Sequence, residues 1–371
     1  SGSGTLTLSG ANSYTGATTV SAGTLTVSGS LSDSTAVSVS TGATYNVNAS
    51  DTIGSIAGAG TVNIASSQTL TAGSAGDTTF SGALTGSGGL TKVGTSTLTL
   101  SGSSSSYTGA ITISNGVLAA SNSNALGTSA GGVSISDGAQ LSLSGGITIV
   151  DAIGVTGSGI SSTGAILNTS GNNTISGLMT MAGASTIGST SGTLTFDVSS
   201  GNAITGTQNL TFTGAGNVTV EDPIATSTGT LTKSDAGTLT LKGLNTYTGI
   251  TTINGGVLSV SILAAGGSPS GIGQSDNGAD KLVIDGGTLK YIGANTSTDR
   301  LFTIGANGAT IDSSGSQSLT FSNTGSLVVT AASSPTLTLT GTNITLSKLS
   351  SVLADPATSG VLTLIKTGTG T

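Results

Sequence analysis

One segment recurs three times, and this repetition limits the possible folds more than any other feature of the sequence. The copies lie near residues 4–27, 96–120 and 237–260. Each copy has a tyrosine followed by Thr-Gly and a β-branched run, then a glycine nine residues after the tyrosine and a leucine eleven residues after it. In copy order these are Tyr14, Gly23 and Leu25, then Tyr107, Gly116 and Leu118, then Tyr247, Gly256 and Leu258. Such self-similarity predicts a stack of similar units, each packed against its neighbours.

The segments between the copies keep the same alternation of apolar residues with Thr or Ser. They read, for example, TVNIASSQTLTA, NLTFTGAGNVTV and KLVIDGGTLKYIG. A period of two over runs of about three to six residues, ended by Gly, Asn-Gly or Asp-Gly, predicts short β-strands. Ser and Thr disfavour helix interiors because their side chains compete for backbone hydrogen bonds, and the best helix candidate, residues 123–127, is a single turn. We therefore expect an all-β fold with short Gly-rich turns and no substantial helix.

Composition favours a β-solenoid over a sandwich or a barrel. Apolar residues are 35% of the chain, which is enough only for a thin core, and 61 of the 371 residues are glycine. In a parallel β-helix the interior is a narrow column of Val, Ile, Leu and Ala, so that a residue such as Leu25 points inward. Outward Thr and Ser suit exposed strand positions, and glycine permits the corners between strands. The sequence therefore predicts a parallel β-helix.

The charged and reactive residues exclude several classes of protein. The net charge is −7 and charged residues are only 6% of the chain, so there is no basic surface for nucleic acid. The absence of Cys and His removes disulfides, thiolate chemistry and the commonest metal ligand. The sequence also has no apolar run of the length, about 18 residues, that a membrane-spanning helix needs. We therefore expect no cofactor, no nucleic-acid partner and no membrane insertion by this segment.

The lead-in to the repeat also recurs, and it relates the two ends of the chain. Residues 83–102 match residues 224–243, with Lys92 and Lys233 at the same place. The chain closes with LIKTGTGT and opens with SGSGTLTLSG, so that its end falls at the phase where it begins. We therefore expect residues 1–371 to form a single continuous β-solenoid, a fragment of a longer tandem-repeat protein. Its units would join end to end, within one polypeptide or as separate copies.

With its flanks the repeat reads G-T-L-T-L-S-G-x-N-x-Y-T-G-x-T-x-V-x-x-G-T-L. This resembles the autotransporter-associated β-helix repeat, which is found in passenger regions of bacterial type V secreted proteins and other giant surface proteins. The first copy, residues 4–25, fits closely and the third, residues 237–258, nearly as well, whereas the second has Ser96 for the leading glycine and one extra residue before Tyr107. Residues 277–325 also resemble stretches between such repeats. The resemblance implies a right-handed parallel β-helix, exported through the outer membrane to the cell surface or the extracellular space.

Two pairs of charged neighbours are the candidates for catalysis or ionic anchoring. Glu221 and Asp222 precede Pro223, and because adjacent strand residues point to opposite faces we expect them to shape a turn rather than to act as paired carboxylates. Asp299 and Arg300, the only arginine, are expected to form an ion pair on the surface or at the base of a loop. Without histidine, no serine has a His partner to activate it. We predict no catalytic residue and no enzyme.

Three further features could bind a ligand, and each has a plainer interpretation. Residues 275–280, SDNGAD, offer oxygens to calcium but lack the ligand ladder and terminal Glu of an EF-hand, so a turn is expected. The motif tyrosines could stack on carbohydrate, but we expect them to pack at corners with their hydroxyls bonded. Thr-Leu-Thr triplets begin at Thr5, Thr24, Thr69 and Thr97, and their spacings of 19, 45 and 28 residues speak against an ice-binding array. We predict no metal-binding or cofactor-binding residue.

Together these features predict a structural and adhesive repeat region of an extracellular bacterial surface protein. It would act as a rigid stalk, fibre or surface layer through many weak polar contacts along its length. The expected partners are copies of the same region, end to end or side by side, and the glycans or proteins of host or neighbouring cells. A β-helical glycan-active enzyme and an ice- or carbohydrate-binding solenoid are the alternatives.

Overall fold

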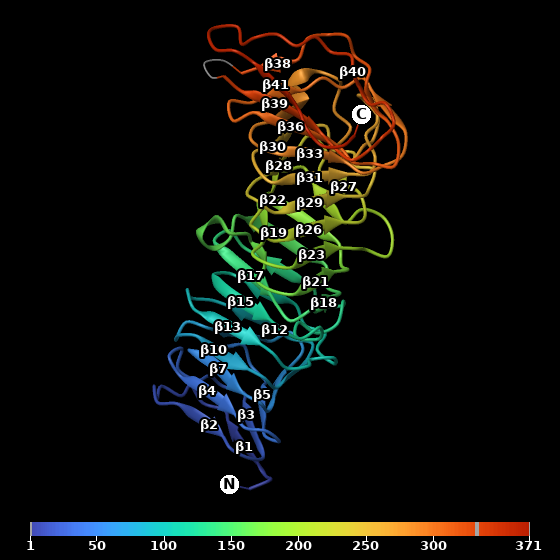
Figure 1. The fold of residues 1–371 in the computed structure, drawn as a ribbon. Coiled ribbons are helices and arrows are strands. Elements are labelled where there is room, and N and C mark those ends of the chain that lie inside the picture. Colours follow the sequence, from blue (N-terminus) through green and yellow to red (C-terminus); the bar gives the residue numbers. More distant parts are fainter. Residues whose placement is uncertain (1, 331–333, 371) are drawn as a thin grey trace. The chain divides into compact units, whose positions relative to one another are not determined.

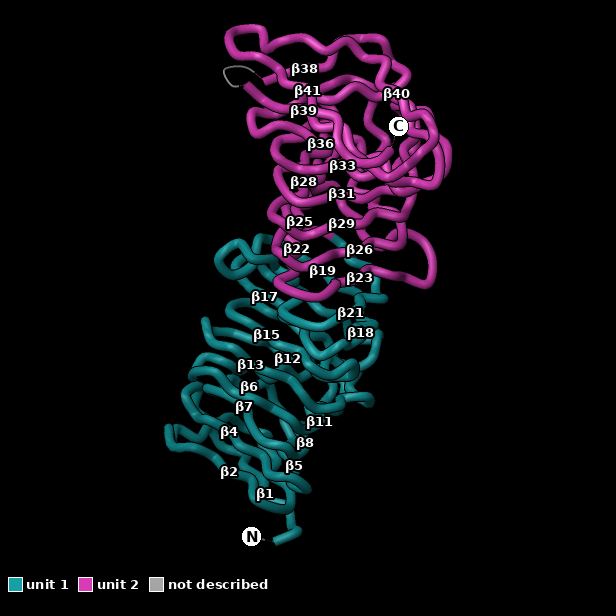
Figure 2. The backbone as a smooth tube through the Cα atoms, in the orientation of Figure 1, with its two compact units in different colours: residues 1–180 teal, residues 181–371 magenta. Residues whose placement is uncertain are grey.

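The computed structural model describes residues 2–330 and 334–370 of the chain. The chain divides into two compact units, residues 1–180 and 181–371 (Figure 2). Within each unit, short strands from successive coils stack in parallel (Figure 1). In the described residues the helical segments are two three-residue 3-10 turns, η1 (Ile160–Ser162) and η2 (Ala279–Lys281). The prediction of an all-β parallel solenoid with no substantial helix is confirmed.

Unit 1 is built from three ladders of parallel strands. Thr sheet 1 contains β1 (Thr5–Leu8), β3 (Thr24–Val27), β5 (Thr44–Val47), β8 (Thr61–Ile64) and β11 (Ala83–Gly86). The second ladder contains β2 (Thr18–Val20), β4 (Ala36–Val39), β7 (Ser55–Gly58), β10 (Thr78–Phe80), β13 (Thr97–Leu100), β15 (Gly116–Ala120), β17 (Ala139–Leu143) and β20 (Ile166–Asn168). The third contains β6 (Asp51–Thr52), β9 (Thr69–Ala72), β12 (Gly89–Lys92), β14 (Ile111–Ile113), β16 (Val133–Ile135) and β19 (Ile153–Gly157). A further pair joins β18 (Thr148–Ile149) to β21 (Asn172–Ile175).

Unit 2 repeats this architecture, and β22 (Met179–Ser189) runs into it from unit 1. Thr sheet 2 contains β23 (Thr193–Phe196), β26 (Asn217–Val220), β29 (Thr238–Leu241), β31 (Val257–Val260), β33 (Thr288–Tyr291), β36 (Ala309–Ser313), β39 (Thr336–Thr340) and β41 (Thr363–Lys366). A second ladder joins β22 to β25 (Leu210–Thr213), β28 (Leu231–Lys233), β30 (Thr251–Ile253), β32 (Leu282–Ile284), β35 (Thr303–Ile304) and β38 (Val328–Val329). Shorter pairings join β24 (Ile204–Gly206) to β27 (Ile224–Ala225), and β34 (Thr296–Thr298) to β37 (Leu319–Phe321) and β40 (Lys348–Leu349).

Alternation along each strand forms the thin core. In β3, β13 and β29 every second residue is buried and the residues between them are half-buried. The buried residues pair with one another from coil to coil. One such column is Leu25, Tyr45, Val62 and Leu84, and another is Leu239, Leu258, Leu289 and Ile311. Each fully buried aliphatic side chain contributes about 1.5–3 kcal/mol, so the inward position predicted for Leu25 is confirmed and stability accumulates coil by coil.

The glycine nine residues after each motif tyrosine is required by both backbone conformation and space. Its φ is +68° at Gly23, +69° at Gly116 and +59° at Gly256, in the left-handed region that L-residues rarely adopt. A Cβ added there would lie 2.3–2.4 Å from a backbone carbonyl oxygen of the preceding coil. The oxygens belong to Gly4, Gly94 and Gly237, respectively. The motif therefore fixes the close approach of consecutive coils.

Two expectations remain, one about membrane-spanning segments and one about the continuity of the solenoid. None of the helical segments in the described ranges has the length and hydropathy to cross a bilayer. The prediction that residues 1–371 form one continuous solenoid within a longer tandem-repeat protein stays a prediction, and Ser1 and Thr371 lie outside the described residues.

Candidate interaction surface

The outward residues of Thr sheet 1 form two polar columns that run from coil to coil. The first column is Thr5, Thr24, Thr44, Thr61 and Ala83, and the second is Thr7, Thr26, Asn46, Asn63 and Thr85. Neighbouring members lie on adjacent parallel strands, which are about 4.8 Å apart. The columns therefore present hydroxyl and amide groups at a regular spacing.

Side-chain hydrogen bonds link the second column along its length. The Asn46 amide donates to the Thr26 hydroxyl at 3.2 Å, and the Asn63 amide donates to the Asn46 carbonyl oxygen at 3.3 Å. The Thr85 hydroxyl then donates to the Asn63 carbonyl oxygen at 3.2 Å. Because each side chain is held by its neighbour, the column is ordered before it meets a partner, which lowers the entropy lost on binding.

The strands of Thr sheet 2, which Figure 1 labels, stack over more coils and also carry two outward columns. Its first column is Thr193, Asn217, Thr238, Val257, Thr288, Thr310 and Thr338, and its second is Thr195, Thr219, Thr240, Ser259, Lys290, Asp312 and Thr340. Within the second column Lys290 and Asp312 form a salt bridge of 3.4 Å between successive coils. These columns are therefore mostly polar, with apolar Val257 and buried Ser259 as exceptions, and the Lys290–Asp312 pair leaves them without net charge.

The four Thr-Leu-Thr triplets noted in the sequence are spread over all three ladders of unit 1. Those beginning at Thr5 and Thr24 are neighbours in Thr sheet 1, whereas those beginning at Thr69 and Thr97 lie on β9 and β13 of the other two ladders. Asn, Ala, Val and a Lys–Asp pair interrupt the columns of both Thr sheets. The columns therefore lack the uninterrupted threonine array that an ice-binding face would need.

The motif tyrosines occupy corners between strands. Tyr107 is fully buried and its hydroxyl donates to the carbonyl oxygen of Gly88 at 2.8 Å. Tyr247 is also fully buried, and its hydroxyl bonds the Thr251 hydroxyl at 2.8 Å. Tyr14 is 42% exposed but bonds Thr18 in the same way at 2.7 Å. The expected corner packing is confirmed for Tyr107 and Tyr247, which leaves their rings inaccessible to a sugar.

Two lysines, Lys92 and Lys233, are buried at the equivalent positions of the two matching lead-in segments. Lys92 and Lys233 point inward, and each ammonium group donates to backbone carbonyl oxygens of its own coil and of the next coil. The acceptors are Val93, Gly94 and Asn115 for Lys92, and Ser234, Asp235 and Gly255 for Lys233. Burial lowers the pKa of each lysine to about 8, so both remain mostly protonated at pH 7. The alternation in Leu-Thr-Lys already places each lysine at an inward position.

Lys366 does not occupy the place that the similarity of the chain ends suggested. It lies on β41 in Thr sheet 2, whereas Lys233 lies on β28 in the second ladder. The segment 353–362, which lies between β40 and β41, forms no strand.

Glu221 and Asp222, which the sequence put forward as neighbouring acids, bond to separate partners. Glu221 forms a salt bridge of 2.8 Å with Lys242, and both side chains are partly exposed. Asp222 accepts a hydrogen bond of 2.8 Å from the backbone N–H of Val198. An exposed ion pair contributes at most about 1 kcal/mol, so both acids stabilise contacts between coils.

Arg300 differs from its expected role as half of an ion pair. It is 2% exposed, and no salt bridge joins it to Asp299 in the described part of the chain. Its guanidinium donates to the Ser275 hydroxyl at 2.8 Å and to the carbonyl oxygens of Ala264 at 3.1 Å and Gly273 at 2.9 Å. Asp299 instead accepts from the Gly266 N–H at 2.8 Å. Adjacent extended residues point to opposite sides, so the two residues anchor one loop, 264–276, from different directions.

In the calcium candidate at residues 275–280, the side-chain oxygens already form bonds within the protein. Ser275 accepts the bond from Arg300, Asp276 accepts from the backbone N–H of Gly278 at 2.9 Å, and Asp280 pairs with Lys281 at 3.0 Å. Over the described ranges, no group of three or more Asp or Glu residues is placed to hold a metal. This geometry is that of a turn.

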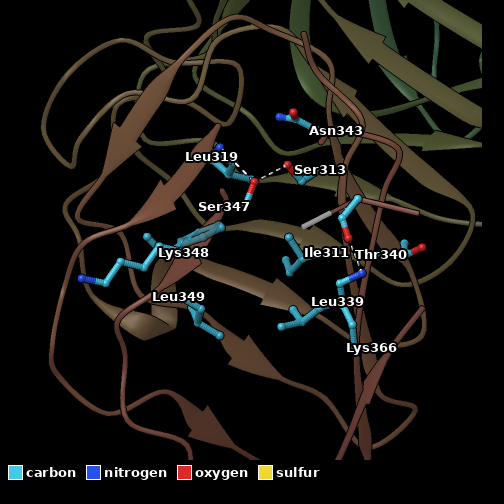
Figure 3. Close-up of a pocket in the computed structure, with 12 residues that line it drawn as sticks. Ile311, Ser313, Leu319, Leu339, Thr340, Asn343, Ser347, Lys348, Leu349 and Lys366 are labelled. Atoms are coloured by element: carbon cyan, nitrogen blue, oxygen red, sulfur yellow. Dashed lines mark hydrogen bonds between the residues drawn. The ribbon is translucent and has the colours of Figure 1, made fainter. Parts of the chain in front are cut away.

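A pocket of about 100 Å³ lies beside β41 in unit 2 (Figure 3). Its wall is mainly apolar. The Ser347 hydroxyl, which also lines it, bonds Ser313 at 3.0 Å and accepts from the Leu319 N–H at 3.3 Å. The lining residues include Ile311, Leu339, Leu349 and Lys366. The pocket is an incompletely filled part of the solenoid interior and gathers no carboxylates.

Comparison with known proteins agrees with this architecture. Residues 1–27, 90–120 and 231–260 match the family model of the passenger-associated-transport-repeat, and they coincide with the three copies found in the sequence. The adhesin BmaC autotransporter of Brucella suis biovar 1 (strain 1330) is 38% identical over 283 residues, which are 76% of this chain and 7% of that relative. No solved structure matches the chain. On the repeats and the relative together, the chain is an autotransporter passenger repeat region.

Proposed function

We propose that this region is an adhesive and structural part of a bacterial cell-surface protein, and that the outward columns of its two Thr sheets are the adhesive surface. As part of an autotransporter passenger the region is extracellular. The observation that carries the proposal is the register that aligns Thr and Asn side chains from coil to coil. The relative with 38% identity is named an adhesin, which supports the same function.

The physical basis of adhesion is the number of weak contacts. A single exposed hydroxyl or amide contributes about 0.5–1.5 kcal/mol when it replaces water by a protein or sugar partner. The several such positions along each column of unit 2 act together through their high effective concentration. The partners in this proposal are glycans or proteins of a host or neighbouring cell, and copies of the region itself. Nearly neutral columns favour partners of low charge.

A variant pair tests the proposal in unit 2. Replacing Thr219 and Thr240, which are neighbours in Thr sheet 2, by glutamate should weaken binding to an immobilised oligosaccharide panel or to intact cells by about tenfold. The matched control replaces Thr211 and Thr232, which are equally paired and half-buried on β25 and β28. Both variants place two carboxylates on adjacent strands, so their folding penalties match. Equal loss of binding in both variants, or no loss in either, would contradict an adhesive role for Thr sheet 2.

The enzyme alternative has no supporting observation in the structure. The acids that the sequence put forward, Glu221 and Asp222, bond to separate partners, and the residues that line the pocket beside β41 include no carboxylate. We propose that the region has no catalytic activity. Release of reducing ends from any glycan of the binding panel would overturn this part of the proposal.

A further inference from the structure

We propose that Asn115 is a site of intramolecular modification. The backbone nitrogen of Gly116 would attack the side chain of Asn115 and close a succinimide ring, which water would open to aspartate or isoaspartate. The inference goes beyond the adhesive function proposed above and does not depend on it.

Four asparagines of the chain are followed directly by glycine, namely Asn115, Asn254, Asn277 and Asn307. Glycine has no Cβ to obstruct the approach of its nitrogen to the preceding side chain, so ring closure is least hindered at such pairs. Because the four pairs share this property, a difference in their reactivity must come from the fold.

At Asn115 the fold brings the reacting groups together. The side chain is exposed in the corner between β14 and β15, and its Oδ1 accepts a hydrogen bond of 2.7 Å from the Gly116 N–H. The attacking nitrogen is therefore already in contact with the carboxamide group whose carbon it attacks. This pre-organised geometry accelerates an intramolecular reaction, and water reaches the exposed residue to open the ring.

A buried positive charge acts on the same peptide group. The Lys92 ammonium group donates to the carbonyl oxygen of Asn115 at 3.2 Å, and its bonds to the carbonyl oxygens of Val93 and Gly94 hold it in place. The Asn115 oxygen and the Gly116 nitrogen belong to one peptide bond, over which charge is delocalised. The ammonium group therefore stabilises the negative charge that forms when the nitrogen loses its proton. Burial makes this stabilisation stronger than it would be in water.

In two of the other pairs the glycine nitrogen is engaged elsewhere. In the pair of Asn277 the glycine N–H donates to Oδ1 of Asp276 at 2.9 Å. In the pair of Asn307 it donates to the carbonyl oxygen of Gly305 at 3.1 Å. Each nitrogen must break that bond before it can attack the preceding side chain, so both asparagines should react more slowly than Asn115.

Asn254 is the matched comparison, because Lys233 lies beside it as Lys92 lies beside Asn115. The Lys233 ammonium group donates to the carbonyl oxygen of Gly255 at 3.5 Å. This oxygen belongs to the peptide bond that follows the reacting one, so the charge does not act directly on the attacking nitrogen. Asn254 should therefore also react more slowly than Asn115.

The reaction conserves atoms and needs only water. The Gly116 nitrogen loses its proton to hydroxide and forms a bond to Cγ of Asn115. The bond between Cγ and Nδ2 breaks, and Nδ2 takes up a proton from water and leaves as ammonia. Water then breaks one of the two bonds between the ring nitrogen and a carbonyl carbon. Breaking the bond to Cγ gives aspartate, and breaking the bond to the backbone carbonyl carbon gives isoaspartate.

The modification turns a neutral side chain into a charged one without an enzyme. The new carboxylate lies on the residue that the Lys92 ammonium group already contacts, so an opposite charge stabilises it. Only 6% of the residues of the chain are charged, so one added carboxylate is a substantial change in the local charge of this corner.

The test follows conversion at all four asparagines in one sample. The purified chain is incubated near neutral pH, in buffer and in urea, and peptides from digestion with pepsin at low pH are quantified by mass spectrometry. In the folded chain Asn115 should convert at least about tenfold faster than the other three. In urea the four rates should agree within about twofold, because the fold no longer distinguishes the pairs. Aspartate and isoaspartate are counted together.

A variant tests the contribution of the buried charge. Lys92→Met removes the charge from its inward position and should slow conversion of Asn115 about tenfold, with the rates at the other three asparagines unchanged. The matched control Lys233→Met, at the equivalent buried lysine, should leave the Asn115 rate unchanged. Unfolding of a variant is recognised because the rates at all four asparagines then move to those seen in urea.

The pH dependence of the unaltered chain tests the same charge without a substitution. Burial lowers the pKa of Lys92 to about 8, and the Asp77 carboxylate opposes this shift by favouring the ammonium form. As pH rises through this value the ammonium group loses its proton, so the ratio of the Asn115 rate to the Asn277 rate should fall. This measurement decides the matter even where Lys92→Met does not fold.

Three results would overturn the inference. They are equal rates at the four asparagines in the folded chain, an Asn115 rate that a folded Lys92→Met variant leaves unchanged, and a rate ratio that does not fall as pH rises.

Discussion

The first and third copies of the repeat have nearly the same sequence but very different environments. Leu6 is 61% exposed and its counterpart Leu239 is fully buried, and the same contrast separates Tyr14 from Tyr247. In both copies the tyrosine hydroxyl bonds the threonine four residues on. What differs is the coil on the other side: β29 lies between β26 and β31, whereas β1 has β3 alone in the described residues. The repeat therefore encodes its local geometry, and its stability comes from its neighbours.

The largest effect is expected from the motif glycine of the third copy. Gly256→Ala should lower the free energy of unfolding of unit 2 by more than about 3 kcal/mol, because it adds backbone strain and a Cβ 2.3 Å from the Gly237 carbonyl oxygen. Gly267 is the matched control, with φ +80° and open space around the added Cβ, and should lose only about 1 kcal/mol. Urea denaturation of both variants measures the difference. Equal losses in the free energy of unfolding would show that the close approach of coils does not contribute to the effect of Gly256→Ala.

Truncation of the paired leucines should reproduce the contrast between the two copies. Leu239→Ala removes a fully buried side chain and should reduce the free energy of unfolding by about 3 kcal/mol. Leu6→Ala should reduce it by less than about 0.5 kcal/mol, since the side chain is largely in water. The measurement is chemical denaturation of the monomeric protein at low concentration. A large effect at Leu6 under those conditions would contradict the contrast, because it would mean that this side chain is buried.

Two buried carboxylates extend the comparison to polar groups of the core. Asp51 accepts a hydrogen bond from the Leu31 N–H at 3.0 Å, whereas Oδ1 of Asp151 is buried without a partner. Burial raises the pKa of Asp151 to about 6, from its usual value of 3.8. Since the folded state then binds the proton more tightly than the unfolded state, the contribution is greatest at low pH and is lost as pH rises through 4 to 6.

This pH dependence can be measured directly. The free energy of unfolding of unit 1 should fall by about 2–3 kcal/mol from pH 4 to pH 7 through Asp151. In Asp151→Asn that part of the pH dependence should disappear, while the part that arises from Asp51 remains. Identical pH profiles for the variant and the unaltered chain would contradict the assignment.

The smallest effect concerns the tyrosine hydroxyls. Tyr247→Phe should reduce the free energy of unfolding by about 1 kcal/mol, because the Thr251 hydroxyl is left with a buried, partly unsatisfied oxygen. Tyr14→Phe should change it by less than about 0.5 kcal/mol, since water replaces the lost bond to Thr18. Thermal unfolding followed by circular dichroism compares the two. Equal shifts in the unfolding temperature would indicate that the stabilisation by the tyrosine hydroxyl bond does not depend on whether the bond is buried.

Local rules in the sequence predicted most of the fold. Alternation placed Leu25 inward, and the recurring glycine marked the close approach of coils at Gly23, Gly116 and Gly256. These features depend on a few neighbouring residues, which is why a single sequence reveals them. The resemblance to passenger repeats agrees with the family match over the same segments.

The registers between coils could not be predicted, because the coils differ in length. Thr5, Thr24, Thr44, Thr61 and Ala83 are successive partners, so the coils contain 19, 20, 17 and 22 residues. The turns between strands differ in length, so the residues of one column do not recur at a fixed spacing in the sequence. The burial of Arg300 was missed for a related reason, since its acceptors lie on a loop 24 to 36 residues earlier in the chain.

The most direct test of the account is a disulfide scan across two neighbouring strands, since the chain has no cysteine of its own. Thr219 and Thr240 are partners on β26 and β29, so their Cα atoms lie about 4.8 Å apart, within the range that a disulfide can bridge. The account predicts that Thr219→Cys with Thr240→Cys forms an intramolecular disulfide on mild oxidation. Thr219→Cys with Lys242→Cys, displaced by two residues, should not form one. Efficient cross-linking of the displaced pair, or none of the aligned pair, would contradict the stacked register from which the fold and the adhesive columns are derived.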